Sequence, residues 1–167
     1  FGLLDRDGRL LGNPVHYRDA RTEGMMDKAF SRMPRETLFE HTGLAFMPFN
    51  TLYQLLALEG HPLAGLADRL LFMPDLLAHA LTGEITCEYT IASVSALLDI
   101  HTRQFSTEIL TALDIPPHLF TNLSMPGQLK GALSPAAAKE LGLPRIPLAL
   151  VGSHDTASAV AAIPGSG

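Results

Sequence analysis

The residues best suited to chemistry lie together near the end of the chain, in the run Ser153-His154-Asp155-Thr156. An apolar run at 146–151 and Gly152 precede them, and a run of mostly small residues at 157–162 follows. This order predicts a buried strand, a tight turn and a helix over 146–163. Because open α/β sheets bind ligands at the carboxyl ends of their strands, we expect the turn to face a ligand.

Asp155 places a carboxylate at this turn, where it could act as a general base. The start of a helix favours a negative charge. An ionised carboxylate can take a proton from a hydroxyl group, a general-base step worth about 10²–10⁴-fold in rate. The simpler interpretation is that Asp155 or Ser153 only caps the helix. Spacing alone slightly favours the cap, so the choice depends on other parts of the chain.

Two further chemistries use the same residue types. Ser153, His154 and Asp155 are the members of a hydrolase triad, but adjacent residues cannot easily adopt its geometry and no G-x-S-x-G motif is present. A His-Asp pair could also serve a metal phosphohydrolase, which stays a minor alternative. No other histidine shows metal-ligand spacing, and no metal-binding residue is predicted. These histidines are His16, His41, His61, His79, His101 and His118.

A second candidate segment, 46–51, combines aromatic residues with a polar tip. Phe49 and Asn50 could form one wall of a sugar pocket. They could equally belong to a packed loop in which Asn50 is the N-cap of the helix that follows. The sequence leaves both interpretations open.

The remaining patterns predict an α/β protein with a helical insertion between strands. The Asp7-Gly8 turn between apolar runs predicts a β-hairpin over 1–15. Helix starts and stops then predict a mainly helical region over 20–142. The expected helices begin at or near Thr22, Pro34, Asn50, Pro74, Ser106 and Ser134, and glycines end those that stop at Gly43, Gly60, Gly83 and Gly142.

Composition excludes several classes of function. The net charge is −5 and the 12 Lys and Arg residues form no basic stripe, which argues against nucleic-acid binding. The apolar runs are shorter than the roughly 20 residues of a membrane helix, so no membrane partner is expected. Cys87 is alone and cannot form an internal disulfide, which fits a small buried thiol in the reducing cytoplasm. No G-x-x-x-x-G-K-[ST] or G-x-G-x-x-G loop is present for nucleotide phosphates.

Seven stretches together resemble the FGGY family of carbohydrate kinases, and within it the kinases of L-rhamnulose. Two of these stretches are long and specific, and the resemblance covers nearly the whole chain. They are FMPFNTLYQL at 46–55, SHDTASAV at 153–160, LLD at 3–5, PVHYRD at 14–19, MPDL at 73–76, LTG at 81–83 and EYT at 88–90. One departure is Ile91, which stands where relatives often have Asn after Tyr-Thr.

The resemblance implies a ribonuclease H-like lobe of an actin-like ATPase fold. It further implies ATP-dependent phosphorylation of L-rhamnulose at its 1-hydroxyl. Asp155 would be the catalytic base, His154 and Thr156 would bind the sugar, and Phe49 and Asn50 would lie in the pocket wall. Fuculose and xylulose are alternative ketoses.

The chain starts without Met and stops in a loop composition, which predicts that both ends belong to a longer protein. The resemblance implies that ATP and Mg²⁺ are bound mainly by parts outside this sequence, including a C-terminal lobe that would be its partner. No cofactor-binding residue is therefore predicted in this segment. By itself, residues 1–167 could be a non-catalytic domain.

Overall fold

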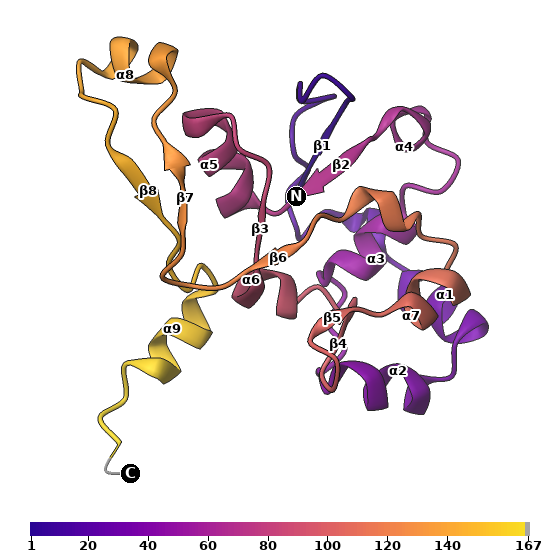
Figure 1. The fold of residues 1–167 in the computed structure, drawn as a ribbon. Coiled ribbons are helices and arrows are strands. Elements are labelled where there is room, and N and C mark those ends of the chain that lie inside the picture. The colour runs from indigo at the N-terminus through magenta and orange to yellow at the C-terminus, as the bar shows by residue number, and fades with distance from the viewer. Residues whose placement is uncertain (166–167) are drawn as a thin grey trace.

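A computed structural model describes residues 1–165 of the chain. Helices and short strands are interspersed along the chain, and the strands form four separate two-stranded sheets within the described residues. Figure 1 shows a helical body on one side, an arm formed by β7, β8 and α8, and α9 extending below that arm. The bounds of β7, β8, α8 and α9 are Leu129–Ala132, Pro147–Ala149, Pro135–Leu141 and Asp155–Ala161.

The N-terminal strand β1 (Gly2–Leu4) pairs antiparallel with β2 (Arg69–Leu71), a strand that lies far along the sequence. The Asp-Gly turn forms, and the amide of Asp5 donates to the carbonyl of Arg9 at 2.9 Å. The second run of the expected hairpin, however, contributes only an isolated bridge through Leu10. Pro14 has no N–H to donate, which discourages pairing further along this run.

The helical body is built from one 3₁₀-helix and four short α-helices. Gly43, with a φ of 61°, ends α2 as the sequence predicts. The helix expected from Thr22 begins later, because Thr22 lies in the 3₁₀-helix and Gly24 is the N-cap of α1. The elements are η1 (Ala20–Thr22), α1 (Met25–Arg32), α2 (Arg35–Thr42), α3 (Thr51–Leu56) and α4 (Pro62–Leu66).

The middle of the chain connects this body to the arm. Strand β3 pairs parallel with β6, and β4 pairs antiparallel with β5. Ser106 caps α7 by accepting a hydrogen bond from the amide of Ile109, as predicted. The elements are α5 (Met73–Thr82), β3 (Cys87–Glu88), α6 (Tyr89–Ser93), β4 (Leu98–Asp99), β5 (Gln104–Phe105), α7 (Thr107–Ala112), η2 (Pro117–Leu119) and β6 (Leu123–Ser124).

The core lies around α3, which packs against α1. Its largest fully buried side chains include Leu52, Tyr53, Leu56, Ile109 and Leu113. Burial raises the pKa of Tyr53 to about 12, and its hydroxyl has no hydrogen-bond partner among the described residues.

Cys87 is buried as predicted, and burial raises the pKa of its thiol. None of the helices in residues 1–165 is long and apolar enough to cross a membrane.

The burial of strand β8 differs from the prediction. The strand expected to be buried at 146–151 is largely exposed. It pairs antiparallel with β7, and in the described chain it has no second strand neighbour. Pro147 and Ala149 are exposed, Leu148 is half-buried and the side chain of Val151 extends into solvent. A strand with one neighbour covers its backbone on one edge only, so its apolar composition does not ensure burial.

Candidate functional site

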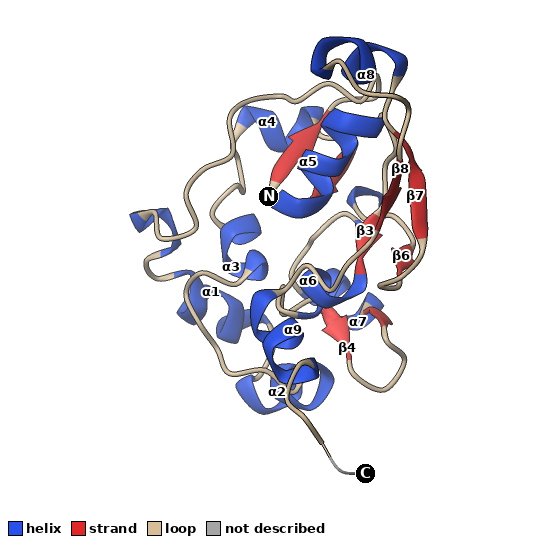
Figure 2. Cartoon of the chain, turned by 90° about the vertical axis from the view of Figure 1, so that its left-hand side faces the viewer, coloured by secondary structure: helices blue, strands red, loops and turns tan. Residues whose placement is uncertain are grey.

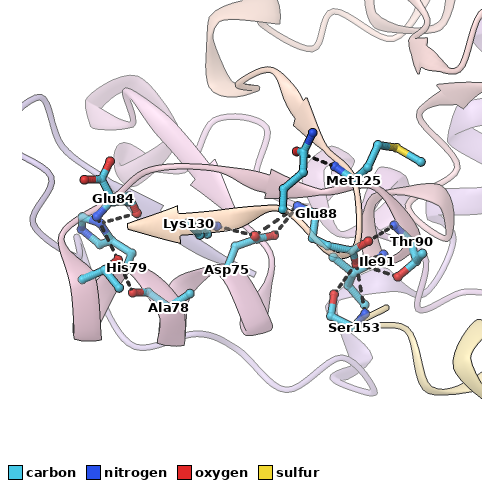
Figure 3. Close-up of polar contacts among 12 residues, drawn as sticks. Asp75, Ala78, His79, Glu84, Glu88, Thr90, Ile91, Met125, Lys130 and Ser153 are labelled. Atoms are coloured by element: carbon cyan, nitrogen blue, oxygen red, sulfur yellow. Dashed lines mark hydrogen bonds and ion pairs between the residues drawn. The ribbon is translucent and has the colours of Figure 1, made fainter. Parts of the chain in front are cut away.

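The predicted turn between β8 and α9 is held in place by a carboxylate from another part of the chain. Oε2 of Glu88 accepts hydrogen bonds from the amide of Ser153 at 3.1 Å and from its hydroxyl at 2.5 Å. The amide of His154 donates to Oγ1 of Thr90 at 3.1 Å. Figure 3 shows Ser153 facing Glu88, and Figure 2 places α9 beside α6. The turn is therefore anchored to the start of α6.

Asp155 is the first residue of α9 and its side chain is 97% exposed. Its Oδ1 accepts from the amide of Thr156 at 2.7 Å and lies 3.7 Å from Nε2 of His154. An exposed carboxylate on an anchored turn is accessible to a ligand hydroxyl, as general-base chemistry requires. The structure thus brings Asp155, His154 and Thr156 together at the start of one helix.

The helix-cap interpretation is met only in part. His154, rather than Ser153 or Asp155, occupies the N-cap position of α9, and its side chain makes no capping hydrogen bond. The hydroxyl of Ser153 donates to Glu88 instead. This also separates Ser153 from the hydrolase triad, in which the serine hydroxyl donates to the histidine.

Gly152 is favoured by a close approach rather than by a special backbone angle. A Cβ at this position would lie 2.8 Å from the hydroxyl oxygen of Ser158, which itself donates to the carbonyl of Gly152. The φ angle of Gly152 is not among the positive values of the chain. The glycine thus lets the first turn of α9 fold back onto the end of the strand.

The second candidate segment, 46–51, is held by hydrogen bonds of Asn50 to the main chain. Asn50 is the N-cap residue of α3 but does not cap it with its side chain. Its Oδ1 accepts from the amide of Met47 at 2.8 Å, and its Nδ2 donates to the carbonyl of Val94 at 2.8 Å. Phe49 is exposed and makes an edge contact with Tyr17 at a centroid separation of 5.7 Å.

No hydrogen bond within residues 1–165 joins Phe49 or Asn50 directly to the turn at 153–156, but helix α6 connects the two segments. Its N-cap residue Glu88 holds Ser153. Its C-cap residue Val94 accepts from Asn50. The two segments that the sequence singled out are thus attached to opposite ends of one short helix.

Glu88 is the residue that reasoning from the sequence missed. It is 1% exposed, and it caps α6 by accepting from the amides of Thr90 at 2.8 Å and Ile91 at 3.2 Å. Burial acts to raise the pKa of its carboxyl, but hydrogen bonds from Ser153 and Thr90 outweigh burial and lower it. The signal present in the sequence was the EYT stretch at 88–90, which carried no assigned role.

Ile91, the residue that the resemblance marked as a departure, fits this arrangement. Its amide donates to Glu88, and its side chain packs against the hydrophobic core. The main chain thus makes the polar contact at this position, and an aliphatic side chain is accommodated.

A buried ion pair between Lys130 and Asp75 holds the main chain of Glu88. Nζ of Lys130 on β7 lies 2.7 Å from Oδ1 of Asp75 on α5, and the two side chains are 0% and 1% exposed. Both carboxylate oxygens of Asp75 also accept from the amide of Glu88, at 3.1 and 3.2 Å. Burial raises the pKa of Asp75, while Lys130 and the amide of Glu88 oppose that shift. Figure 3 shows the continuous path from Lys130 through Asp75 to Glu88.

The structure offers no metal site of its own in the part that it describes. No group of three or more His, Cys, Asp or Glu side chains in residues 1–165 is arranged to hold a metal ion. The metal phosphohydrolase alternative therefore has no donor set among these residues, and no chemical step is assigned to a metal bound by them.

Comparison with known proteins gives a consistent result. The model of the N-terminal domain of the FGGY family of carbohydrate kinases matches residues 2–162. A rhamnulokinase of Bacteroides thetaiotaomicron is 42% identical over 166 residues, which are 98% of this chain and 34% of that protein. A rhamnulokinase of Enterococcus faecalis is 41% identical over 167 residues, 100% of this chain and 34% of that protein.

Solved structures show the same fold. The crystal structure of xylulose kinase from Rhodospirillum rubrum matches with a TM-score of 0.86 at 23% identity, over 99% of this chain and 34% of that one. A carbohydrate kinase from Novosphingobium aromaticivorans matches with a TM-score of 0.77 at 28% identity, over 95% of this chain and 34% of that one. The predicted α/β class, part of an actin-like ATPase fold, is confirmed. The chain spans about a third of the length of these relatives.

Proposed function

Because this chain belongs to the FGGY family of carbohydrate kinases, we propose that it contributes to an enzyme that transfers phosphate from ATP to the 1-hydroxyl of L-rhamnulose. The choice of sugar is supported by the rhamnulokinases that are 42% and 41% identical to this chain. The proposal concerns a complete kinase polypeptide that carries residues 1–167 together with the other two thirds of the length of its relatives. We place this enzyme in the cytoplasm, because a single buried cysteine fits a compartment that keeps thiols reduced.

Asp155 acts as the general base in this proposal. Its exposed carboxylate takes the proton from the sugar hydroxyl as that oxygen attacks the γ-phosphoryl group. The observation that carries the proposal is the combination of an exposed carboxylate with an anchored backbone at Ser153 and His154. A base gains most when its position is fixed before the substrate arrives.

His154 and Thr156 flank the base and would donate to or accept from hydroxyl groups of the sugar. Phe49 is exposed and available as an apolar wall. Asn50 contributes differently, because both ends of its carboxamide are engaged with the main chain. It would shape the pocket by fixing the loop that carries Phe49.

ATP is the second substrate, and a Mg²⁺ ion bound with it would neutralise charge on its phosphates. The described residues do not provide a metal-binding cluster, so we assign this ion to other parts of the kinase. The work of residues 1–167 is to bind and orient the sugar and to accept its proton.

The test is Asp155→Asn in the complete kinase, with ADP release measured against L-rhamnulose concentration. We expect kcat to fall by about 10²–10⁴-fold with a small change in KM, because the amide cannot accept the proton. Asp27→Asn is the matched control, since Asp27 is an exposed carboxylate in the first turn of α1. Near-normal turnover of Asp155→Asn would overturn the assignment.

A ketose panel tests the choice of sugar. Fuculose and xylulose remain alternative substrates, and a higher kcat/KM for either one would replace L-rhamnulose in the proposal. The second class of function, a non-catalytic isolated domain, applies to residues 1–167 alone. These residues should release no ADP in the presence of the sugar, and robust sugar-dependent ADP release would refute that expectation.

A further inference from the structure

Glu88 makes an unusual number of hydrogen bonds for a buried side chain. Its carboxylate accepts five, from the amides of Thr90, Ile91 and Ser153 and from the hydroxyls of Thr90 and Ser153. A buried charge is tolerated when it is hydrogen-bonded on this scale. The number of donors explains why the residue stays charged although it is almost completely inaccessible to solvent.

These donors come from two places in the chain, and this division assigns Glu88 two tasks. The bonds to Thr90 and Ile91 cap α6, a local task that many side chains could perform. The bonds to Ser153 cross 65 positions of sequence and hold the turn that leads into Asp155. A shorter acceptor can also cap a helix, whereas the contacts with Ser153 are made by Oε2 at the end of the glutamate side chain.

Thr90 strengthens the second task. Its hydroxyl donates to Oε2 of Glu88 at 2.6 Å, and its oxygen accepts from the amide of His154 at 3.1 Å. Glu88 therefore controls two consecutive amides of the turn, Ser153 directly and His154 through Thr90. The next residue is Asp155, and within residues 1–165 its exposed side chain contacts His154 and Thr156.

The main chain of Glu88 is fixed as well. Its amide donates to Asp75, which is paired with Lys130 in a site inaccessible to solvent. The anchor thus runs from β7 and α5 through β3 to the turn before α9. The Lys130 end of this path is buried and Ser153 is half-buried, so a displacement of Asp155 would break hydrogen bonds that solvent replaces only in part.

We infer that Glu88 is a positioning residue for phosphoryl transfer, which sets the location of the Asp155 carboxylate through Ser153 and Thr90 without touching the sugar. The inference rests on the proposed function of Asp155 as the base. It adds a residue 67 positions earlier in the sequence whose length, rather than charge alone, determines the geometry of the reacting group.

Glu88→Asp in the complete kinase separates the two tasks. Aspartate keeps the charge and is a good N-cap residue, so the cap of α6 is retained. Its side chain is one methylene shorter and no longer reaches Ser153. A misplacement of the base by about 1 Å can reduce the rate by about 10²-fold, so we expect kcat for L-rhamnulose to fall by 10–100-fold while KM changes less than about 3-fold.

Two further variants keep the inference falsifiable. Ser153→Ala removes the hydroxyl contact and leaves the cap untouched, so it should also lower kcat, by roughly 3–10-fold, with an unchanged melting temperature. Glu84→Asp is the matched control, because Glu84 is exposed and undergoes the same chemical change. It should leave kcat as it is. Amide hydrogen exchange at Ser153 and His154 should be faster in Glu88→Asp than in the unaltered enzyme.

Asp155→Asn is measured in parallel to keep the two proposals apart. If Asp155→Asn is inactive and both Glu88→Asp and Ser153→Ala keep normal kcat, Glu88 only caps α6 and the inference fails alone. If Glu88→Asp loses activity only in proportion to its folded fraction and Ser153→Ala is normal, the role is structural and the inference also fails. Normal turnover of Asp155→Asn overturns the proposed base.

Discussion

The buried pair of Lys130 and Asp75 provides a sharp test of how this fold is stabilised. Lys130→Met keeps an aliphatic side chain of similar size and removes the ammonium group that lies 2.7 Å from Asp75. Within residues 1–165 the carboxylate then keeps the amide of Glu88 as its only donor. Breaking a buried ion pair by removing one partner costs about 3–5 kcal/mol of unfolding free energy. We expect about 3 kcal/mol near pH 8, because Asp75 keeps one hydrogen bond.

The pH dependence of this loss follows from the direction of the pKa shift. Burial already raises the pKa of Asp75, and removal of Lys130 raises it further. A carboxyl group whose pKa is higher in the folded state gives stability that is full below its unfolded pKa and is lost as pH rises through its folded pKa. The deficit of Lys130→Met relative to the unaltered chain should therefore be smaller near pH 5 than near pH 8, because Asp75 can then take up a proton.

Urea unfolding followed by circular dichroism at the two pH values measures both effects. Lys139→Met is the matched control, since Lys139 is exposed on α8 and its loss should cost less than about 0.5 kcal/mol. The double variant Asp75→Asn/Lys130→Met should recover most of the deficit, because neither position then leaves an unpaired buried charge. A cost below about 1 kcal/mol near pH 8, or a deficit equal at both pH values, would refute the reasoning.

Two more predictions concern single contacts. Gly152→Ala should cost about 1 kcal/mol, since its Cβ displaces the hydroxyl of Ser158 from the carbonyl at 152. With Ser158→Ala as background the added cost should nearly vanish, and an additive double-mutant cycle would contradict this. In the helical body, Nδ1 of His41 lies 2.7 Å from Asp99, and Nε2 lies 3.1 Å from Glu108. The hydrogen bond to Asp99 is the main reason that the pKa of His41 is raised above 6.5. The stability lost in His41→Gln should thus be greatest below about pH 6.5 and shrink as pH rises through the folded pKa, so urea midpoints that differ equally near pH 6 and pH 9 would disprove it.

The parts of the fold that could be predicted from sequence are those governed by neighbouring residues. Ser106 and Ser134 cap the helices that follow them, and Gly83 and Gly142 end theirs in the left-handed conformation. Each of these outcomes depends on a side chain or a φ angle within one turn of the helix end. The helix predicted after the turn at 152–155 forms as α9, although no side chain caps it.

The parts that could not be predicted depend on contacts between distant segments. The pairing of Gly2 with Leu71 replaces most of the expected hairpin, and no local pattern indicates it. The exposure of β8 depends on its having a single strand neighbour, whereas its sequence indicates only that it is apolar. The role of Glu88 depends on a contact with Ser153 across 65 positions. In the sequence Glu88 looks like any glutamate near a turn. Its burial, which only the structure shows, sets it apart from the exposed glutamates.

Helix α6 gives these observations a common physical meaning. It has five residues, too few to be stable by itself in water, where isolated helices shorter than about 12–15 residues are marginal. Its stability must come from tertiary contacts, which are the packing of Ala92 and Ile91 in the core and the hydrogen bonds of Glu88 and Val94 at its ends. The same contacts fix the turn before Asp155 and the loop that carries Phe49. A change that destabilises α6 should therefore displace both candidate segments together, so that turnover and sugar affinity are lost in one transition rather than two.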